Sequence, residues 1–272
     1  MAATDEPSKP ASEESGAFCW LDVYYYVDEW AQFTHLDAAF IREEEAELLK
    51  RVDVTFVVSQ KLLEDKRRQG SHVHLVPHGV DHPLFARALD PSFVPAPQLD
   101  GLQRPMVGFY GTLYDWVDQQ LIVDMAKLRP GWSFVLVGTI MTDITLLRSQ
   151  PNIHMVKSRP HDELPRYCKG FDVGIIPFRM DDPRMQSVNP LKLREYLAAG
   201  LPVVTVDLPE VHGMGEGVFI AGDAEAFVAA VEEALQRNDS ASRQARSDRM
   251  RSESWEARVA SIDAVLSGIG VA

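Results

Sequence analysis

The chain contains 272 residues, 46% of them hydrophobic and 25% charged, which is typical of a globular protein with one large or two modest domains. The formal net charge of -13 argues against non-specific binding to nucleic acid or anionic membranes, because both attract basic surfaces. No apolar run reaches the length of a transmembrane helix, about 18 residues. Cys19 and Cys168 lack the spacing of a metal site, so we expect reduced thiols in a cytosolic protein.

The first part of the chain predicts a flexible tail followed by an incomplete α/β domain. Residues 1–16 are polar and acidic without an apolar segment, which is typical of a disordered tail and not of a secretion signal. Over residues 17–90, short apolar runs alternate with amphipathic stretches, the pattern of βαβ units. The predicted elements are strands at Val23–Val27, Val54–Val58 and Val73–Val76 and a helix at Ala39–Arg51. A complete doubly wound domain has about six strands, so the opening βα units are missing here.

A turn and a linker are predicted between this domain and the next. His78 and Gly79 favour a tight turn after the third strand, with Gly79 at positive φ, and Pro83 is expected to keep the following segment extended. The prolines and glycine of residues 91–105 predict a linker at the domain boundary.

Residues 106–252 predict a complete second domain with a parallel sheet, so the fold class is α/β. The predicted strands are Met106–Tyr110, Ser133–Gly138, Asn152–Val156, Asp172–Ile176, Pro202–Val206 and Val218–Ile220, with helices around Val117–Leu128, Thr142–Ser149, Leu164–Lys169, Pro190–Ala199 and Ala224–Gln236. A last helix, at residues 253–268, carries Trp255, Val259, Ile262 and Leu266 at helical spacing and therefore needs a partner surface.

Residues 187–204 form the most informative stretch, because they combine a helix start, a cation and a carboxylate. The free amides near Asn189 and the Lys192 ammonium would attract a phosphate. Glu195, one turn further on the same face, can accept hydrogen bonds from hydroxyl groups such as those of a ribose. The spacing is equally consistent with an exposed ion pair between Lys192 and Glu195. A phosphate site beside a diol site would bind a nucleotide.

Other candidate ligand-binding residues follow the strands of the second domain. Gly111 and Thr112 lie at the carboxyl end of the first strand, where ligands collect in doubly wound sheets and a glycine permits close approach of a diphosphate. Arg159 and Phe178 lie in loops at the same sheet edge and are candidates for pairing with phosphate and for lining a base or sugar pocket. Such residues more often serve packing or solubility.

Several motifs together resemble the GT-B glycosyltransferases of group 1, in particular the GumK-like and TuaH-like sugar transferases. They are AAGLPVV at 198–204 after a helix with an acidic residue, the glycine loop FYGTLYDW at 109–116, and a PNGVD-like turn with His78 in place of the asparagine. The resemblance covers about residues 23–266. It implies two Rossmann-like domains, the first incomplete, with the C-terminal helix crossing back onto the first. By the same resemblance Lys192 touches the donor diphosphate and Glu195 the ribose.

The resemblance implies metal-independent transfer of a sugar from a nucleoside-diphosphate sugar to a sugar or lipid-linked acceptor, and the cysteines favour the cytoplasm as its location. Peripheral membrane contact is compatible with such an acceptor, and no cofactor beyond the donor is expected. No DxD motif occurs, and Asp181–Asp182 is not read as a metal site. Asp28, directly after the first strand, is the candidate general base, although aspartate there also commonly caps the next segment. Glu29 is the alternative base, and His35 is a weaker one.

Two other functions stay open. The missing βα units favour a non-catalytic nucleotide-sugar-binding or assembly protein, and a nucleotide-sugar epimerase on the same fold is a third interpretation. Dehydrogenase and P-loop ATPase functions are excluded, because no GxGxxG follows a strand and no GxxxxGK[ST] is present.

Overall fold

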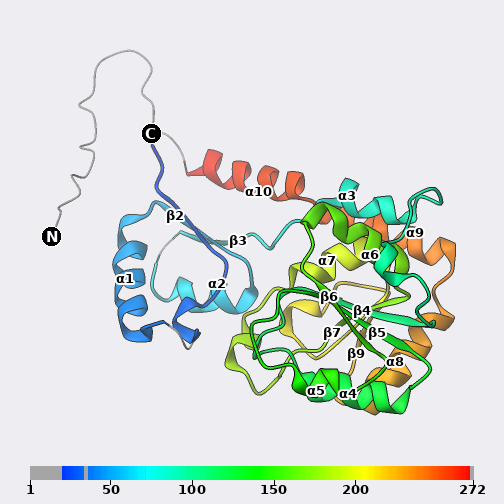
Figure 1. Ribbon diagram of the computed structural model, residues 1–272. Coiled ribbons are helices and arrows are strands. Elements are labelled where there is room, and N and C mark those ends of the chain that lie inside the picture. Colours follow the sequence, from blue (N-terminus) through cyan, green and yellow to red (C-terminus); the bar gives the residue numbers. More distant parts are fainter. Residues whose placement is uncertain (1–19, 34–35, 71, 270–272) are drawn as a thin grey trace.

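Two α/β lobes lie side by side in the computed structural model (Figure 1), which describes residues 20–33, 36–70 and 72–269. The first lobe contains a three-stranded sheet of order β1-β2-β3, and the second a six-stranded sheet of order β6-β5-β4-β7-β8-β9. All strand pairs in both sheets are parallel. The α/β class and the two parallel sheets predicted from the sequence are therefore confirmed, whereas the predicted tail and Cys19 lie outside the described residues.

The first lobe is built around β2, whose side chains are all buried. Its elements are β1 (Val23–Tyr26), α1 (Ala38–Arg51), β2 (Val54–Val57), α2 (Gln60–Arg67) and β3 (Val73–Leu75). Because side chains alternate along a strand, Val57 packs with α2 on one face while Val54 and Phe56 point to the other. The sequence analysis missed α2, although Ser59 caps it by accepting the Leu62 amide hydrogen at 3.3 Å.

The C-terminal helix covers the second face of β2. This helix, α10 (Trp255–Gly268), packs Ile262, Val265 and Leu266 against Val54, Phe56 and Val76. It extends from the second lobe over the first in Figure 1. The predicted apolar face is partly wrong, since Val259 is 54% exposed while Val265, which the pattern omitted, is packed.

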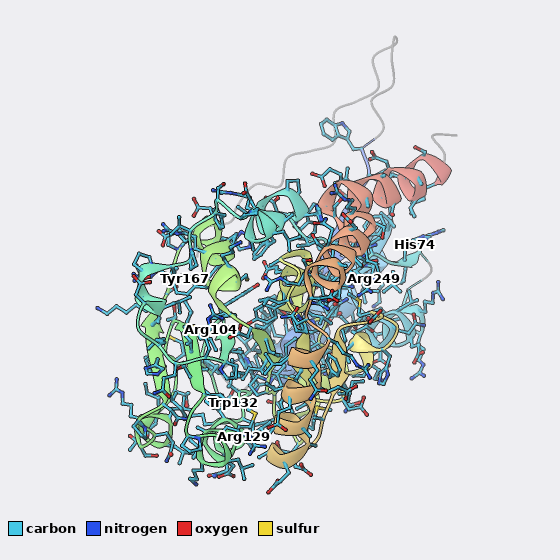
Figure 2. All side chains as sticks on the ribbon, turned by 90° about the vertical axis from the view of Figure 1, so that its right-hand side faces the viewer. His74, Arg104, Arg129, Trp132, Tyr167 and Arg249 are labelled. Carbon is cyan, nitrogen blue, oxygen red and sulfur yellow. The ribbon has the colours of Figure 1, made fainter. Side chains whose placement is uncertain are left out.

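The second lobe contains all six predicted strands. Its elements are α3 (His82–Ala86), β4 (Met106–Tyr110), α4 (Gln119–Leu128), β5 (Ser133–Gly138), α5 (Thr145–Arg148), β6 (Ile153–Lys157), α6 (Leu164–Gly170), β7 (Val173–Ile176), α7 (Leu191–Ala198), β8 (Val203–Thr205), β9 (Val218–Ile220), α8 (Ala224–Gln236) and α9 (Ser240–Arg249). The central strands read as continuous apolar runs because helices cover both faces of the sheet. Arg129, directly after α4, stacks on Trp132, with its guanidinium carbon 5.6 Å from the ring centroid (Figure 2). It also donates to Glu232 of α8 at 2.8 Å.

Two helices of this lobe were not predicted. The polar helix α9 shows little apolar periodicity and is stabilised by packing on α7, with Ser247 donating to the Ala198 carbonyl at 2.6 Å. Pro83 does not keep its segment extended, so that prediction is wrong. Pro83 lies in the first turn of α3, where a missing amide hydrogen costs nothing, and Asp81 is the N-cap residue of this helix.

Residues 91–105, predicted to be a linker, pack against α6. Ala96 and Leu99 are buried in the large core of the second lobe. The Ala96 amide donates to the Arg166 carbonyl at 3.1 Å, and the Tyr167 hydroxyl donates to Gln98 at 2.9 Å. None of the described helices is long and apolar enough to cross a bilayer.

Gly79 has a different role from the predicted one. It is absent from the described glycines with positive φ, so the predicted left-handed turn is wrong. A Cβ on Gly79 would instead come within 2.7 Å of the Trp255 Cα, so the glycine is required for close approach of the two segments. The Val80 amide donates to the Glu253 carbonyl at 3.0 Å, and the Trp255 amide donates to the Val80 carbonyl at 3.3 Å.

We therefore expect Gly79→Ala to lower the free energy of unfolding by about 1–3 kcal/mol, because the added methyl group must displace the start of α10. Urea denaturation of the purified protein measures this. Gly131→Ala is the matched control, since nothing lies within 4 Å of a Cβ at that glycine. Equal stability of the two variants would contradict the proposed packing constraint.

Candidate functional site

The second sheet has a topological switch point between β4 and β7. From β4 the chain continues outward to β5 and β6 on one side, and β7, β8 and β9 fill the other. Ligands of open α/β sheets bind outside the carboxyl ends of the strands at such a point. Gly111 directly follows β4, and Phe178 comes two residues after β7. Both predicted residues therefore lie beside the switch point.

Lys192 is the cation at this point. Its Nζ lies 5.0 Å from the ring centroid of Phe109 and 4.7 Å from that of Phe178. A Cβ on Gly111 would come 3.3 Å from Lys192 Cε, and the φ of +135° at Gly111 disfavours any other residue. Burial lowers the pKa of Lys192 to about 8. Among the described residues no carboxylate forms an ion pair with this ammonium, which leaves its charge for an anion.

Glu195 is buried and held by two hydrogen-bond donors. The Tyr110 hydroxyl donates to its Oε2 at 2.9 Å, and His161 Nε2 lies 2.7 Å from its Oε1. The hydrogen bond to Glu195 raises the pKa of His161. Within the described part of the chain, Lys192 and Glu195 do not form the exposed ion pair that their spacing also allowed. The carboxylate is oriented by β4 and by the short helix η4 (His161–Glu163), and its oxygens retain lone pairs for further donors.

The Asn189 side chain joins the two lobes. Its Nδ2 donates to the Val58 carbonyl at the end of β2 at 2.6 Å, and its Oδ1 accepts from Arg194 Nη1 at 2.5 Å. Pro190 occupies the N-cap position without a capping hydrogen bond, and α7 (Leu191–Ala198) begins one residue later than predicted. The structure therefore places Asn189 at the helix start as expected, but commits its side chain to a contact between lobes.

Arg194 extends this contact and was missed by the sequence analysis. The buried guanidinium donates through Nε to Glu253 at 3.1 Å. Glu253 also pairs with Arg258 of α10, whose Nε donates to the His78 carbonyl at 3.4 Å. Burial lowers the pKa of His78 to about 4, so its ring is neutral at physiological pH. No local pattern marks Arg194, because its ion-pair partner Glu253 is 59 positions away in the chain.

Asp28 lies two residues beyond β1 and is half-buried. Burial raises the pKa of its carboxyl group, and among the described residues no hydrogen bond or ion pair is made to this carboxylate, although the Asp28 backbone carbonyl accepts from the Trp30 amide at 3.0 Å. Glu29, the alternative base, is instead paired with Lys66 at 3.3 Å. His35 lies outside the described residues.

Known structures share this architecture. Anabaena HepE, solved in complex with UDP and glucose, matches with a TM-score of 0.68 at 16% identity, covering 90% of this chain and 71% of that one. Sucrose-phosphate synthase from Thermosynechococcus elongatus matches with a TM-score of 0.66 at 17% identity, covering 93% and 68%. At these identities the similarity establishes the fold.

Sequence comparisons establish the family. Residues 104–237 match the family model "Glycosyl transferases group 1". The Bacillus subtilis (strain 168) protein TuaH, named for glycosyl transfer in teichuronic acid biosynthesis, is 32% identical over 231 residues, which cover 79% of this chain. The chain is a group 1 glycosyltransferase homologue with the GT-B fold. It spans 57% of the length of this curated relative.

Two other predicted site residues of this glycosyltransferase homologue are less closely associated with Lys192. Thr112 is exposed next to Gly111. Arg159 lines a separate cavity of about 530 Å³ together with β6, and its Nε is buried without a hydrogen-bond partner among the described residues. Gly111, Phe178, Lys192 and Glu195 therefore form the compact part of the site.

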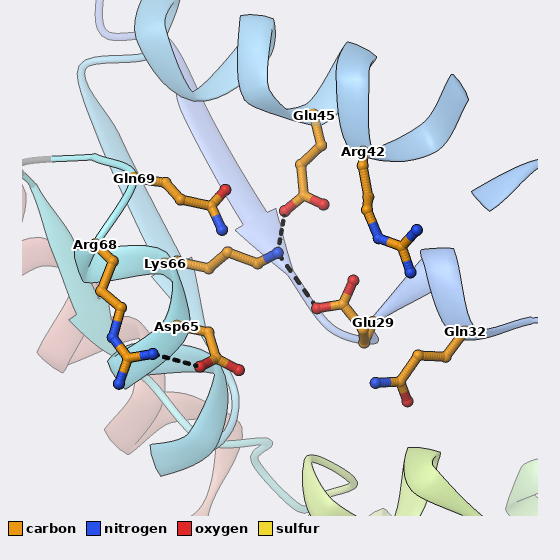
Figure 3. A pocket seen from close by; sticks show the side chains of 8 residues that line it. All are labelled: Glu29, Gln32, Arg42, Glu45, Asp65, Lys66, Arg68 and Gln69. Atoms are coloured by element: carbon orange, nitrogen blue, oxygen red, sulfur yellow. Dashed lines mark hydrogen bonds and ion pairs between the residues drawn. The ribbon is translucent and has the colours of Figure 1, made fainter. Parts of the chain in front are cut away.

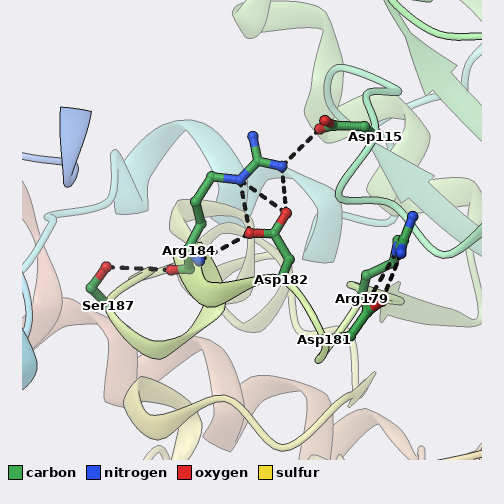
Figure 4. A network of polar contacts seen from close by, with 6 residues as sticks. All are labelled: Asp115, Arg179, Asp181, Asp182, Arg184 and Ser187. Carbon is green, nitrogen blue, oxygen red and sulfur yellow. Dashed lines mark hydrogen bonds and ion pairs between the residues drawn. The ribbon is translucent and has the colours of Figure 1, made fainter. Parts of the chain in front are cut away.

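A network of polar contacts holds the loop before α7 in the glycosyltransferase homologue (Figure 4). Arg184 forms an ion pair with Asp182 and also donates to Asp115 at 2.9 Å. Its guanidinium stacks on Trp116 at 4.9 Å and on Phe33 of the first lobe at 5.7 Å. The loop is thus held against both lobes by charge and stacking.

No metal site is formed by the neighbouring aspartates. Asp181 pairs with Arg179 at 2.7 Å, while Asp182 is held by Arg184. Over the described ranges, no group of three or more His, Cys, Asp or Glu side chains is placed to hold a metal ion.

The contribution of His161 to the free energy of unfolding of the glycosyltransferase homologue should depend on pH. Folding raises the pKa of His161 above its ordinary value of 6.5, so the protonated ring stabilises the folded state through its bond to Glu195. This stabilisation is fully present below about pH 6.5 and is lost as the pH rises through the pKa of the folded state. His161→Gln should therefore reduce the free energy of unfolding more at about pH 5.5 than at about pH 9. Urea denaturation at both pH values measures the difference.

The control is His72→Gln, at an exposed histidine whose ring bonds to none of the described residues. It should not reproduce the pH-dependent loss. An equal effect of His161→Gln at both pH values would show that the imidazole does not act through its charge.

Proposed function

We propose that this chain binds a nucleoside-diphosphate sugar at the switch point of its second lobe and transfers the sugar to a carbohydrate acceptor. The observation that carries the proposal is the Lys192 ammonium, which lies beside Gly111 without an ion-pair partner among the described residues, one turn before the buried Glu195. Membership of the group 1 glycosyltransferases supports it. So does the similar fold of HepE, which was solved with UDP-glucose.

The diphosphate would lie between Gly111 and the N-terminus of α7. The helix dipole and first-turn amides attract negative charge, and Lys192 adds a full positive charge in a partly desolvated position. These groups stabilise the charge that develops on the leaving nucleoside diphosphate as the glycosidic bond breaks. We therefore propose transfer without a metal ion.

The ribose would bind at Glu195. Tyr110 and His161 each occupy one carboxylate oxygen and fix its orientation, and each oxygen can accept a further hydrogen bond from a ribose hydroxyl. Phe178 would form one wall of the site. We assign Thr112 to the glycine loop over the diphosphate and Arg159 to an outer position on its approach.

The general base would come from the first lobe. Burial raises the pKa of Asp28 and makes it a better proton acceptor than an exposed aspartate. The acceptor oxygen attacks the anomeric carbon, its proton passes to Asp28, and the nucleoside diphosphate departs. In this scheme residues 17–90 and the helix 253–268 form the acceptor side, and residues 106–252 form the donor side.

Lys192→Gln should weaken UDP binding by on the order of 10- to 100-fold, because a charge-assisted hydrogen bond contributes about 1.5–3 kcal/mol. Isothermal titration calorimetry with UDP, GDP, ADP and dTDP measures the affinity and also identifies the base. Lys127→Gln, at an exposed lysine of α4, is the matched control and should bind like the wild type.

Lys192→Arg adds a second readout. Above about pH 8 the wild-type lysine loses its proton, so nucleotide affinity should fall with rising pH in the wild type and not in the arginine variant. Unchanged affinity in Lys192→Gln would place the diphosphate elsewhere.

Asp28→Asn should abolish sugar transfer while leaving nucleotide affinity unchanged, because the base acts only in the chemical step. The purified chain is incubated with each donor, and released nucleoside diphosphate is measured by chromatography. Nucleotide binding without any release by the wild type would favour the non-catalytic alternative. Interconversion of donor sugars without an acceptor would favour an epimerase.

A further inference from the structure

A second polar cavity lies in the first lobe and shares no lining residue with the donor site. It measures about 340 Å³ (Figure 3). Its lining residues come from the segment after β1, from α1, and from the end of α2, and they include Glu29, Gln32, Arg42, Glu45, Lys66 and Gln69. The mechanism proposed above uses none of these side chains.

The floor of the cavity is a buried charged group. Lys66, which is 4% exposed, pairs with Glu45 at 2.6 Å and with Glu29 at 3.3 Å. The Tyr26 hydroxyl donates to Glu45 at 3.3 Å, and the lysine ammonium lies 4.4 Å from the Tyr26 ring centroid. Buried ion pairs are often less stabilising than apolar packing of the same volume. Such a floor is therefore better explained by recognition of a ligand than by stability.

The mouth of the cavity has unused hydrogen-bonding groups of both kinds. Gln32 Oε1 is buried without a hydrogen-bond partner among the described residues. The Arg42 guanidinium makes no ion pair or hydrogen bond with any other part of the described chain. In Figure 3, Arg42, Glu29 and Gln32 lie on the same side of Lys66, with Glu29 between the other two. A buried acceptor without a partner and an exposed guanidinium donor in the lining of one cavity can both bind hydroxyl groups, which donate and accept.

The charges and the size of the cavity restrict the ligand further. Three acidic residues (Glu29, Glu45 and Asp65) are balanced by three basic ones (Arg42, Lys66 and Arg68), so the lining has no formal net charge. This balance favours a neutral polar ligand over a phosphate or carboxylate. The volume lies at the lower end of the range for ligand sites, about 300–1,000 Å³, which suits one sugar ring and not an extended chain.

We propose that this cavity binds one uncharged sugar residue of the acceptor. Glu29, which lines the cavity, directly follows Asp28 in the chain, so the segment after β1 carries both the residue that we assign as general base and one wall of the cavity. The identity of this sugar as acceptor rests on the proposed function, whereas the binding of a neutral sugar does not.

Saturation-transfer NMR tests the site on the whole purified chain without any donor. The probes are D-glucose, D-galactose, D-mannose and N-acetyl-D-glucosamine, with D-glucuronate and inorganic phosphate as charged comparisons. We expect saturation transfer to at least one neutral sugar. Its binding should weaken by at least about threefold in Arg42→Ala and in Gln32→Leu, the effect of losing one hydrogen bond. Arg51→Ala, exposed at the end of the same helix α1, is the matched control and should bind normally.

Several results would overturn the assignment. These are no transfer to any of the four sugars, binding that both variants leave unchanged, or binding of glucuronate or phosphate in place of neutral sugars. Circular dichroism confirms that each variant is folded. UDP affinity, measured in parallel, separates the two proposals: UDP binding without sugar binding contradicts only the cavity, and sugar binding without UDP binding contradicts only the donor site.

Discussion

The hydrogen bonds around Asn189 and Arg194 are the constraint on which the arrangement of the two lobes depends. The Asn189 amide joins the end of β2 to the start of α7, and the buried Arg194 joins α7 to Glu253 just before α10. A buried guanidinium without these partners would carry a large desolvation cost, so each partner of Arg194 contributes to the stability of this arrangement. Their geometry aims the N-terminus of α7 at the boundary between the lobes.

The positive charge of Lys192 at the switch point is opposite in sign to the net charge of the whole chain. With a formal net charge of -13 the protein repels anions at long range, so an anion can be held only where the structure concentrates positive charge. In the donor site that we propose, Lys192, with its ring contacts and its glycine neighbour, supplies this charge. The two aromatic rings also keep the ammonium partly out of water, which lowers its pKa and strengthens its interaction with a bound anion.

The first lobe combines an apolar and a polar interior in a small volume. On one face of β2 the strand packs against α10, and α2 covers the other. Between α1 and α2 the interior becomes polar, with Lys66 at its centre. The apolar face of the sheet attaches the C-terminal helix, and the buried ionic group between α1 and α2 forms the floor of the cavity that we propose binds a sugar.

The sequence by itself determined the second sheet and the residues of α7. Its strands are continuous apolar runs, and β4, β5, β9 and α8 have the bounds that local patterns predicted. Helical spacing was sufficient to place Lys192 and Glu195 on neighbouring turns. Only the tertiary structure decided that Glu195 is held by Tyr110 and His161, that Asn189 bonds to Val58 across 131 positions of the chain, and that Gly79 accommodates Trp255. Periodicity and turn preferences act over a few residues, whereas these contacts depend on segments that folding alone brings together.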